Sequence, residues 1–311
     1  LLADGVAHPA EIQFRSELAQ LLEADFEVEL TPAEDDRPSQ QIRISQPSPP
    51  TSSDVDHPFF KPFEFHFSSD PDALTRQVGA DRALLDQALA TLEAQRKTGN
   101  GKLTGKKNLA DFIGSGEAFL DGHTYVRMPK PGRKHELIVL GDLHGCYSIL
   151  KATVLQSRFF EKVDAYRKDP QNQPYPLLVL LGDYIDRGRF SLNGVLRTVL
   201  QLFVTAPDHV VVLRGNHEYY VEVNGTMYGG VKPAEAINTL KPHLPVDVFR
   251  HYRTLFEAMP NVLLFDRFFF VHGGIPRDRS IKEKWKDLSS LNDGDLRFQM
   301  MWSDPSSADV I

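Results

Sequence analysis

Four short polar blocks, each placed after an apolar stretch, are the feature that most constrains the fold of this chain. They read GDLHG at 141–145, GDYIDRG at 182–188, GNHE at 215–218 and HGG at 272–274. Glycine lets the backbone turn sharply where a strand ends, and it leaves room for a ligand to approach. The polar residues beside the glycines are hard or borderline ligands for metal ions. We therefore expect strands whose ends bring the four blocks together in space.

The apolar stretches have the length and composition of buried strands. Each is a short continuous run, as in strands that are covered on both faces, and helical patterns lie between them. After the fourth run, Asp266 and Arg267 are placed to turn a hairpin. This alternation predicts an α/β fold, a β-sandwich flanked by helices, with its site at the strand ends. The predicted strands cover residues 137–140, 177–181, 210–213, 262–265 and 268–271.

The part of the chain before these strands is organised differently. Residues 1–58 combine a small unit of helix and strand patterns with a linker that is rich in proline, serine and acidic residues. Residues 59–133 are expected to form a mainly helical extension, because residues 81–96 place leucines on one face of a helix. The α/β domain is expected to span residues 134–311.

Composition narrows the classes of partner. The 311 residues carry a net charge of −7, whereas a general nucleic-acid binder needs a surplus of lysine and arginine. No apolar run in the sequence has the length of a membrane span, so we expect neither a nucleic-acid nor a membrane partner. Cys146 is the single cysteine of the sequence and excludes an internal disulfide. This fits a reducing compartment, and we expect a cytoplasmic protein.

Five residues of the four blocks form a set of potential metal ligands. Asp142 and His144 are one residue apart, so at an extended strand end both side chains point the same way and reach one ion. Asp183 has two carboxylate oxygens and is able to bridge two cations, as two-metal hydrolysis requires. Asn216 offers an amide oxygen and His272 an imidazole nitrogen, and this mixture suits Mn, Fe or Zn better than Ca.

The four blocks, in this order, resemble the phosphoprotein phosphatases. This family lies within the calcineurin-like metallophosphoesterases and includes the serine/threonine protein phosphatases, and a bacterial-type member is expected. The resemblance covers residues 136–305. It implies a calcineurin-like fold with two divalent metal ions, Mn²⁺ being preferred over Fe or Zn. The implied ligands are Asp142, His144 and Asp183 for the first ion, and Asp183, Asn216 and His272 for the second.

The resemblance also implies a mechanism. A hydroxide that bridges the metals attacks phosphorus, and His217 donates a proton to the leaving oxygen. Asp186 pairs with His217, Arg187 grips two phosphate oxygens, and Asn216 and His217 complete the substrate-binding set. The implied substrate is a phosphoprotein or phosphopeptide, with phosphoserine and phosphothreonine preferred. Arg214 either binds phosphate or pairs below the site, and the sequence leaves both alternatives open.

The C-terminal part departs from the family pattern. Residues 302–305, WSDP, resemble a family landmark that is followed by a second phosphate-binding arginine and a further histidine ligand, yet the sequence stops at Ile311. We therefore expect a C-terminally incomplete domain that holds one ion well and the other weakly.

Two other functions remain open at this point. One is a metal-binding pseudophosphatase that serves as a scaffold, which the missing C-terminal elements would favour. The other is a nucleotide or dinucleoside polyphosphate hydrolase. Such hydrolases resemble the first and third blocks but typically lack an aspartate at the position of Asp186, which favours the protein phosphatase. The sequence does not indicate an oligomeric state.

Overall fold

Two β-sheets and a set of helices place the four blocks at one end of the molecule. The computed structural model describes residues 56–303, with gaps at 64–70, 113–116, 130–131 and 189–190. The helix and strand patterns predicted within residues 1–30, and all but the last residues of the predicted linker, lie outside this described part.

The first sheet consists of three parallel strands in the order β3–β4–β5. They are β3 (His135–Leu140), β4 (Tyr175–Leu180) and β5 (Val210–Val212). All six residues of β4 are buried, as the continuous apolar run predicts. Because the strands are parallel, their carboxyl ends lie at the same edge of the sheet, and the first three blocks begin there. The three predicted strands are confirmed.

The second sheet has four strands in the order β1–β2–β8–β9. They are β1 (Phe119–Asp121), β2 (Thr124–Arg127), β8 (Val262–Phe265) and β9 (Phe268–Val271). The predicted hairpin between β8 and β9 is confirmed, and Asp266 takes a left-handed conformation in its turn (φ 52°). Strand β2 pairs with β8 in parallel. Sequence analysis did not predict β1 and β2, which come from the stretch expected to be mainly helical.

The two sheets share one hydrophobic core, and β8 shows how the second sheet is covered on both faces. Leu263 and Phe265 of β8 pack into the core that also contains the whole apolar run of β4. Val262 and Leu264, which point to the opposite face, pack in a second cluster with Met300. This arrangement is the predicted sandwich of an α/β fold.

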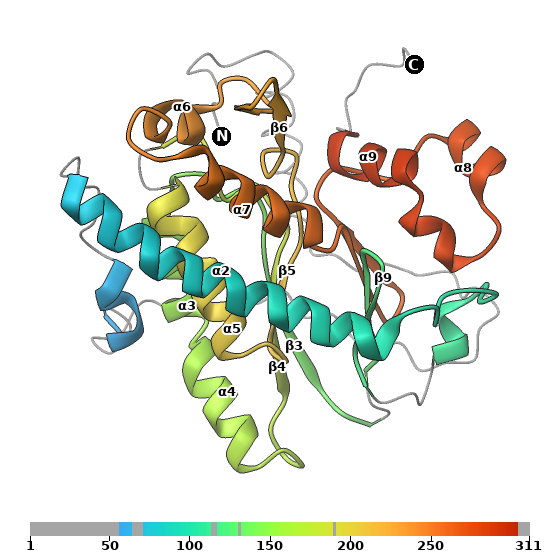
Figure 1. The fold of residues 1–311 in the computed structure, drawn as a ribbon. Coiled ribbons are helices and arrows are strands. Elements are labelled where there is room, and N and C mark those ends of the chain that lie inside the picture. The colour runs from blue at the N-terminus through green and yellow to red at the C-terminus, as the bar shows by residue number, and fades with distance from the viewer. Residues whose placement is uncertain (1–55, 64–70, 113–116, 130–131, 189–190, 304–311) are drawn as a thin grey trace, which may run out of the picture. The chain divides into compact units, whose positions relative to one another are not determined.

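Helices cover the outside of the sandwich. The longest is α2 (Pro71–Gly99), which is longer than the predicted helix at 81–96 and packs against α5 (Arg197–Thr205), α7 (Val246–Ala258) and β1. Figure 1 shows α2 crossing the face of the molecule in front of α5. Its predicted apolar stripe of Leu84, Leu85, Ala88 and Leu92 is buried. Helix α7 begins after Pro245, because proline suits the start of a helix.

The remaining elements are short. A hairpin of β6 and β7 follows GNHE, and Asn224 and Gly225 turn it with positive φ angles of 51° and 75°. None of the helices in the described ranges has the length and apolar character of a membrane span. The other elements are η2 (Pro58–Phe63), η3 (Leu109–Phe112), α3 (Tyr147–Gln156), α4 (Phe159–Lys168), the π-helical η4 (Ser191–Leu196), β6 (Tyr220–Val223), β7 (Thr226–Gly229), α6 (Glu235–Leu240), α8 (Asp278–Lys284), η5 (Leu288–Asn292) and α9 (Gly294–Trp302).

Candidate metal centre

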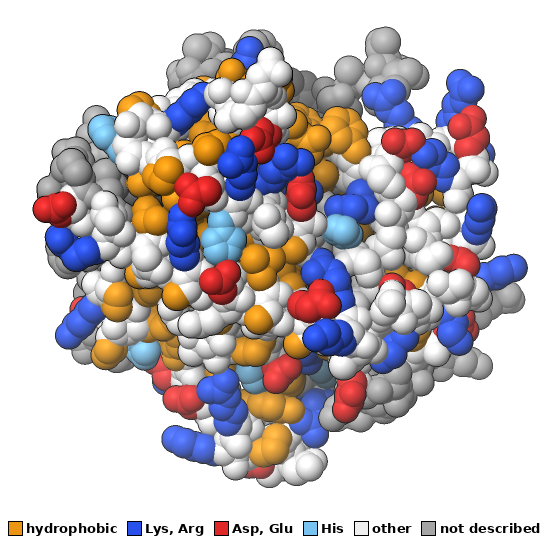
Figure 2. All heavy atoms as spheres, viewed as in Figure 1, with side chains coloured by type: hydrophobic (Ala, Val, Ile, Leu, Met, Phe, Trp, Pro, Cys, Tyr) orange, Lys and Arg blue, Asp and Glu red, His pale blue; other side chains and the backbone are white. Residues whose placement is uncertain are grey.

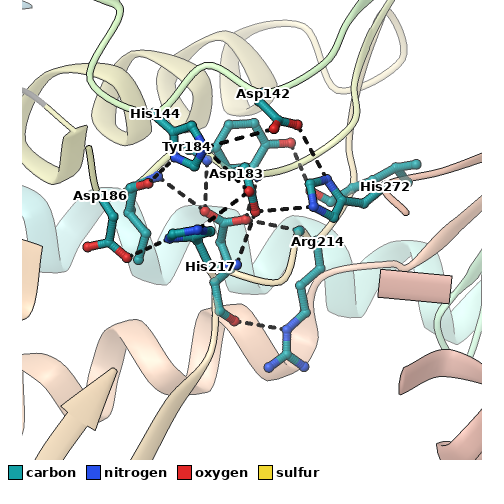
Figure 3. Close-up of polar contacts among 12 residues, drawn as sticks. Asp142, His144, Asp183, Tyr184, Asp186, Arg214, His217 and His272 are labelled. Carbon is teal, nitrogen blue, oxygen red and sulfur yellow. Dashed lines mark hydrogen bonds and ion pairs between the residues drawn. The ribbon is translucent and has the colours of Figure 1, made fainter. Parts of the chain in front are cut away.

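The four blocks converge on the carboxylate of Asp183. Figure 3 shows Asp142 and His144 from the loop after β3, His217 from the loop after β5 and His272 from the end of β9, all directed toward Asp183. Residues separated by up to 130 positions in the sequence thus lie side by side, as the strand-end prediction requires.

Asp183 stands between two groups of potential ligands. Its Oδ2 atom lies 3.5 Å from His144 Nε2 and 3.9 Å from His217 Nε2, and its Oδ1 atom lies 3.4 Å from His272 Nε2. Asp142 lies 3.9 Å from His144 Nε2 and 3.8 Å from His272 Nδ1. The ligand atoms of His144, Asp183 and His217 lie within 4.8 Å of one another, and so do those of Asp142, Asp183 and His272.

This grouping differs in two respects from the predicted ligand sets, because His217, predicted as the proton donor, lies with His144 and Asp183, and Asp142 lies with His272. Asp183 belongs to both groups, as expected for a bridging carboxylate, and Asp142 is close to His144 as predicted. Asp142 is, however, equally close to His272, so it reaches both groups as well. Its side chain is 57% exposed, which places it on the open side of the centre, whereas Asp183 is buried.

Unpaired acceptor atoms at this centre fit a cation. Among the described residues, His144 Nε2, Asn216 Oδ1 and His272 Nδ1 are buried without a hydrogen-bond partner. Buried polar atoms are rarely left unpaired, because desolvation without a partner costs about 1–3 kcal/mol. His144 Nδ1 lies 2.8 Å from the carbonyl oxygen of Ile185 and donates to it, so the lone pair of Nε2 faces the centre. These nitrogen and oxygen donors fit a divalent metal ion such as Mn²⁺, Fe or Zn²⁺.

His217 and Asp186 form a buried pair beside the potential ligands. His217 Nδ1 lies 2.8 Å from Asp186 Oδ2, and the other oxygen of Asp186 accepts a hydrogen bond from the amide of Ala236 at 2.8 Å. Burial lowers the pKa of His217, but the hydrogen bond to Asp186 and the charge of Asp183 outweigh it, so the pKa lies above its ordinary value. The pairing of His217 with Asp186 expected from the sequence is therefore present in the structure.

The loops that carry these residues are held in unusual backbone conformations. His144, Asp183, Asp186 and Arg187 all have positive φ angles, between 44° and 64°. Such conformations cost on the order of 1–3 kcal/mol each and persist only where surrounding contacts impose them. One such contact is between Gly182, with φ 115°, and Gly215. The two backbones are so close that a Cβ atom on Gly182 would lie 2.3 Å from the amide nitrogen of Gly215.

Glu218 supplies much of this constraint, and sequence analysis assigned it no role. Its fully buried carboxylate accepts hydrogen bonds from four backbone amides, at 2.8 Å from Asp183, 2.8 Å from Tyr184, 3.2 Å from Ile185 and 2.9 Å from Gly215. Burial, followed by the charge of Asp183, raises the pKa of Glu218, while the amide donors oppose this shift. One side chain therefore ties the loop after β4 to the loop after β5.

The two arginines near the centre lie in different surroundings. Arg187 is exposed to solvent in the left-handed loop after Asp186. Arg214 is buried, its Nε atom donates to the backbone oxygen of Glu218 at 2.9 Å, and its guanidinium group lies 5.3 Å from the ring centre of Tyr219. In Figure 3 this group points away from Asp142 and His272. Of the two alternatives for Arg214, the contacts favour a position below the centre.

The chain matches the model of the calcineurin-like phosphoesterase family over residues 135–311, more than half of its length. Among solved structures it is similar to a protein serine/threonine phosphatase from Saccharomyces cerevisiae, with 17% identity, a TM-score of 0.43, and coverage of 74% of this chain and 60% of that one. It is also similar to a cold-active protein-tyrosine phosphatase of a psychrophilic Shewanella species, with 22% identity, a TM-score of 0.36, and coverage of 58% and 52%. Little more than half of each of these two proteins is therefore spanned. The chain belongs to the calcineurin-like phosphoesterase family of metal-dependent enzymes.

Proposed function

We propose that this protein is a phosphoprotein phosphatase that hydrolyses phosphate monoesters on serine and threonine side chains. The observation that carries the proposal is the His217–Asp186 pair, 2.8 Å long and buried beside the shared carboxylate of Asp183. The leaving oxygen of a phosphoserine is strongly basic and needs a proton donor, whereas a diphosphate leaving group needs one far less. A fixed donor beside a cation site therefore supports a phosphate monoester as the substrate.

The residues that would hold two divalent ions are those of the candidate metal centre. When bound, such ions polarise the phosphoryl group and supply an activated water molecule. Asp183 would contribute to both positions through its two oxygens, and Asp142 lies on the open side of the centre. We keep Mn²⁺ as the first candidate for both ions.

His217 would hold and donate the proton. Its Nδ1 atom is engaged by Asp186, so its Nε2 atom is the one that faces Asp183 and the space above it. A hydrogen bond between the amide of His217 and Asp183 Oδ1, 3.0 Å long, fixes the backbone of the donor relative to the carboxylate. The donor and the cluster are thereby positioned as one unit, which is the preorganisation that proton transfer requires.

Arg187 is the proposed clamp for the substrate phosphate. It follows Asp186 directly, its side chain is exposed, and none of the described carboxylates forms a salt bridge with it within 4.0 Å. A free guanidinium group is able to hold two phosphate oxygens at once. Asn216 and His217 would complete the substrate contacts. The expected cytoplasmic location remains a prediction from the single cysteine.

The test compares leaving groups in a His217→Asn variant. We expect turnover of an aryl phosphate with an acidic phenol to fall modestly, and turnover of a phosphoserine peptide to fall by about a further 100-fold, the usual value of a general acid. Manganese content measured in parallel should stay at the wild-type level. Equal slowing of both substrates would remove His217 from this role.

The same assay separates the alternatives. Turnover of the phosphoserine peptide above that of a phosphotyrosine peptide and of a dinucleoside polyphosphate is the expected order. Faster cleavage of the dinucleotide would replace the proposal with a nucleotide hydrolase. Tight binding of the phosphopeptide without turnover, at saturating Mn²⁺, would replace it with a scaffold.

A further inference from the structure

A second polar cluster lies outside the candidate metal centre and consists of cations. It contains Arg96 at the end of α2, Arg214 after β5 and Arg297 in α9, and we call these three residues the arginine cluster. They contact two short segments, the turn between β1 and β2 at residues 122–123, and residues 258–261, which run from the last residue of α7 to the start of β8.

Arg96 joins the two segments. Its Nε atom donates to the carbonyl oxygen of Gly122 at 2.9 Å, and a second nitrogen donates to the carbonyl oxygen of Ala258. The neighbouring His123 lies 2.9 Å from the carbonyl oxygen of Glu257 through its Nε2 atom. Both side chains therefore meet the carboxyl end of α7, where unpaired carbonyls attract donors.

The other two arginines contact the neighbouring residues Pro260 and Asn261. Arg297 Nε donates to Asn261 Oδ1 at 2.8 Å. The backbone amide of Arg214 donates to the carbonyl oxygen of Pro260 at 2.8 Å, and its side chain turns below the metal centre to the carbonyl oxygen of Glu218. Each guanidinium group thus uses one or two of its five donors on neutral oxygens.

None of the described carboxylates compensates these three charges within 4.0 Å, whereas arginines on the neighbouring surface are compensated. Arg250 pairs with Glu222, Arg253 with Glu257, and Figure 2 shows blue and red side chains interspersed over this face. Beyond that distance, the charges of Glu218 and Glu257 favour the charged form of Arg214, whereas Arg297 is repelled by the other two arginines. Burial, followed by the charges of the other two members, lowers the pKa of Arg297 to about 10.

Asn261 adds an independent sign of a missing acceptor. It is only 1% exposed, its Oδ1 atom is taken by Arg297, and its Nδ2 atom is buried without an acceptor among the described residues. A buried amide donor without a partner costs about 1–3 kcal/mol. The unmet buried atom among the described residues at this place is therefore a donor, and an oxygen of an anion would satisfy it.

We propose that the arginine cluster, with Asn261, binds a phosphate dianion at a site distinct from the metal centre. Guanidinium groups match the oxygen pairs of a tetrahedral phosphate, and a dianion offsets the positive charge of three guanidinium groups better than a monoanion does. Arg96 and Arg297 are only partly buried, so the site is open to solvent. Arg214 directly precedes the GNHE block, so the bound anion would contact the side chain next to the segment that carries Asn216 and His217.

The test uses the full chain stripped of divalent ions with a chelator, so that phosphate does not bind through a metal. Inorganic phosphate is titrated by calorimetry at constant ionic strength, in wild type and in Arg297→Gln. We expect one phosphate per chain, with affinity at least tenfold weaker in the variant and at least tenfold weaker for acetate than for phosphate. Arg279→Gln, at a 90% exposed side chain of the adjacent α8, should bind phosphate like wild type.

Three outcomes would overturn the proposal. One is the absence of phosphate binding by metal-free wild type at millimolar concentration. Another is unchanged affinity in Arg297→Gln together with lost affinity in Arg187→Gln, which would place the anion at the metal centre. The third is equal affinity for acetate and phosphate. Arg96→Lys, which keeps the charge but not the planar fork, provides the same comparison if Arg297→Gln does not fold. Phosphate binding by the arginine cluster is independent of catalysis, because it is measured in the metal-free protein.

Discussion

Two asparagines, Asn216 in the candidate metal centre and Asn261 in the arginine cluster, have opposite ends of their amide groups unmet. Asn216, which directly precedes His217, leaves its oxygen unpaired, and Asn261, which contacts Arg297, leaves its nitrogen unpaired. Because an amide carries both an acceptor and a donor, the unmet end shows the sign of the missing partner. We therefore assign a cation to the first place and an anion to the second.

The largest expected effect concerns the residue common to both ligand groups. Asp183→Asn removes the charge and one oxygen acceptor from the metal centre, so turnover of an aryl phosphate with added Mn²⁺ should fall by about 1,000-fold or more, equivalent to about 4 kcal/mol. Metal content, measured by atomic spectroscopy, should fall with it. Asp164→Asn, at an exposed position of α4, is the control and should retain both. Wild-type metal content in Asp183→Asn would break the assignment of a cation to this centre.

Glu218 connects the two regions, since its carboxylate holds the Asp183 loop and its carbonyl oxygen holds Arg214. In Glu218→Gln, one carboxylate oxygen is replaced by an NH₂ group, which donates and does not accept. At least one of the four backbone N–H groups therefore loses its acceptor. We expect the free energy of unfolding of the metal-free protein, measured in urea, to fall by about 3 kcal/mol. Glu235→Gln at an exposed position should change it by no more than about 0.5 kcal/mol. A similar small change in both variants would show that Glu218 does not hold the loops.

The next prediction concerns His123, beside the arginine cluster, and the dependence of stability on pH. Burial, followed by Arg297, Arg96 and Arg214, lowers the pKa of His123 to about 2. Below pH 6.5, His123 therefore binds a proton in the unfolded chain but not in the folded chain. The free energy of unfolding consequently falls as pH falls. From pH 7.5 to 5.0 this amounts to about 2 kcal/mol of unfolding free energy.

The measurement compares urea unfolding of wild type and His123→Gln at both pH values. Glutamine is able to donate to the same carbonyl oxygen but does not titrate. On acidification, the free energy of unfolding of the variant should therefore fall by about 2 kcal/mol less than that of wild type. Identical losses would mean that His123 accepts a proton in the folded state, which the arginine cluster should prevent.

The smallest expected effects come from a matched pair of substitutions. Asn261→Asp places a carboxylate among the arginines and should raise the free energy of unfolding by about 1 kcal/mol, while phosphate affinity falls. Asn216→Asp adds a carboxylate to the centre that contains Asp142 and Asp183. Because like charges repel, it should lower the free energy of unfolding of the metal-free protein by about 1 kcal/mol. Urea unfolding in chelator measures both. Changes of the same sign would contradict the assignment of opposite partners.

The parts of the fold that were predictable are those with a local signature. Five strands were recognisable because each is an unbroken apolar run that ends at a turn, or at most one residue before a glycine. The strands β1 and β2 have only three and four residues, and β2 is held by pairing with β8, more than 130 residues later. That pairing leaves no trace in a local pattern. The β6–β7 hairpin was missed although Asn224 and Gly225 are a recognised signal for a tight turn.

The same distinction applies to the two sites. Ligands such as Asp142 and His144 stand out because they lie within short blocks at strand ends. Glu218 belongs to such a block, but its role depends on four backbone amides whose positions only the folded loops define. Arg96 and Arg297 are 201 positions apart and occupy ordinary helical contexts, so their meeting at one segment is a property of tertiary packing alone.

The pairing of β2 with β8 has a practical consequence for protein expression. The family match begins at residue 135, and a fragment cut there would lack β2. The backbone amides and carbonyls of β8 on that side would then meet water or another molecule, which is the situation that leads to aggregation of exposed sheet edges. Fragments intended for crystallisation should therefore start well upstream of the boundary that sequence similarity suggests.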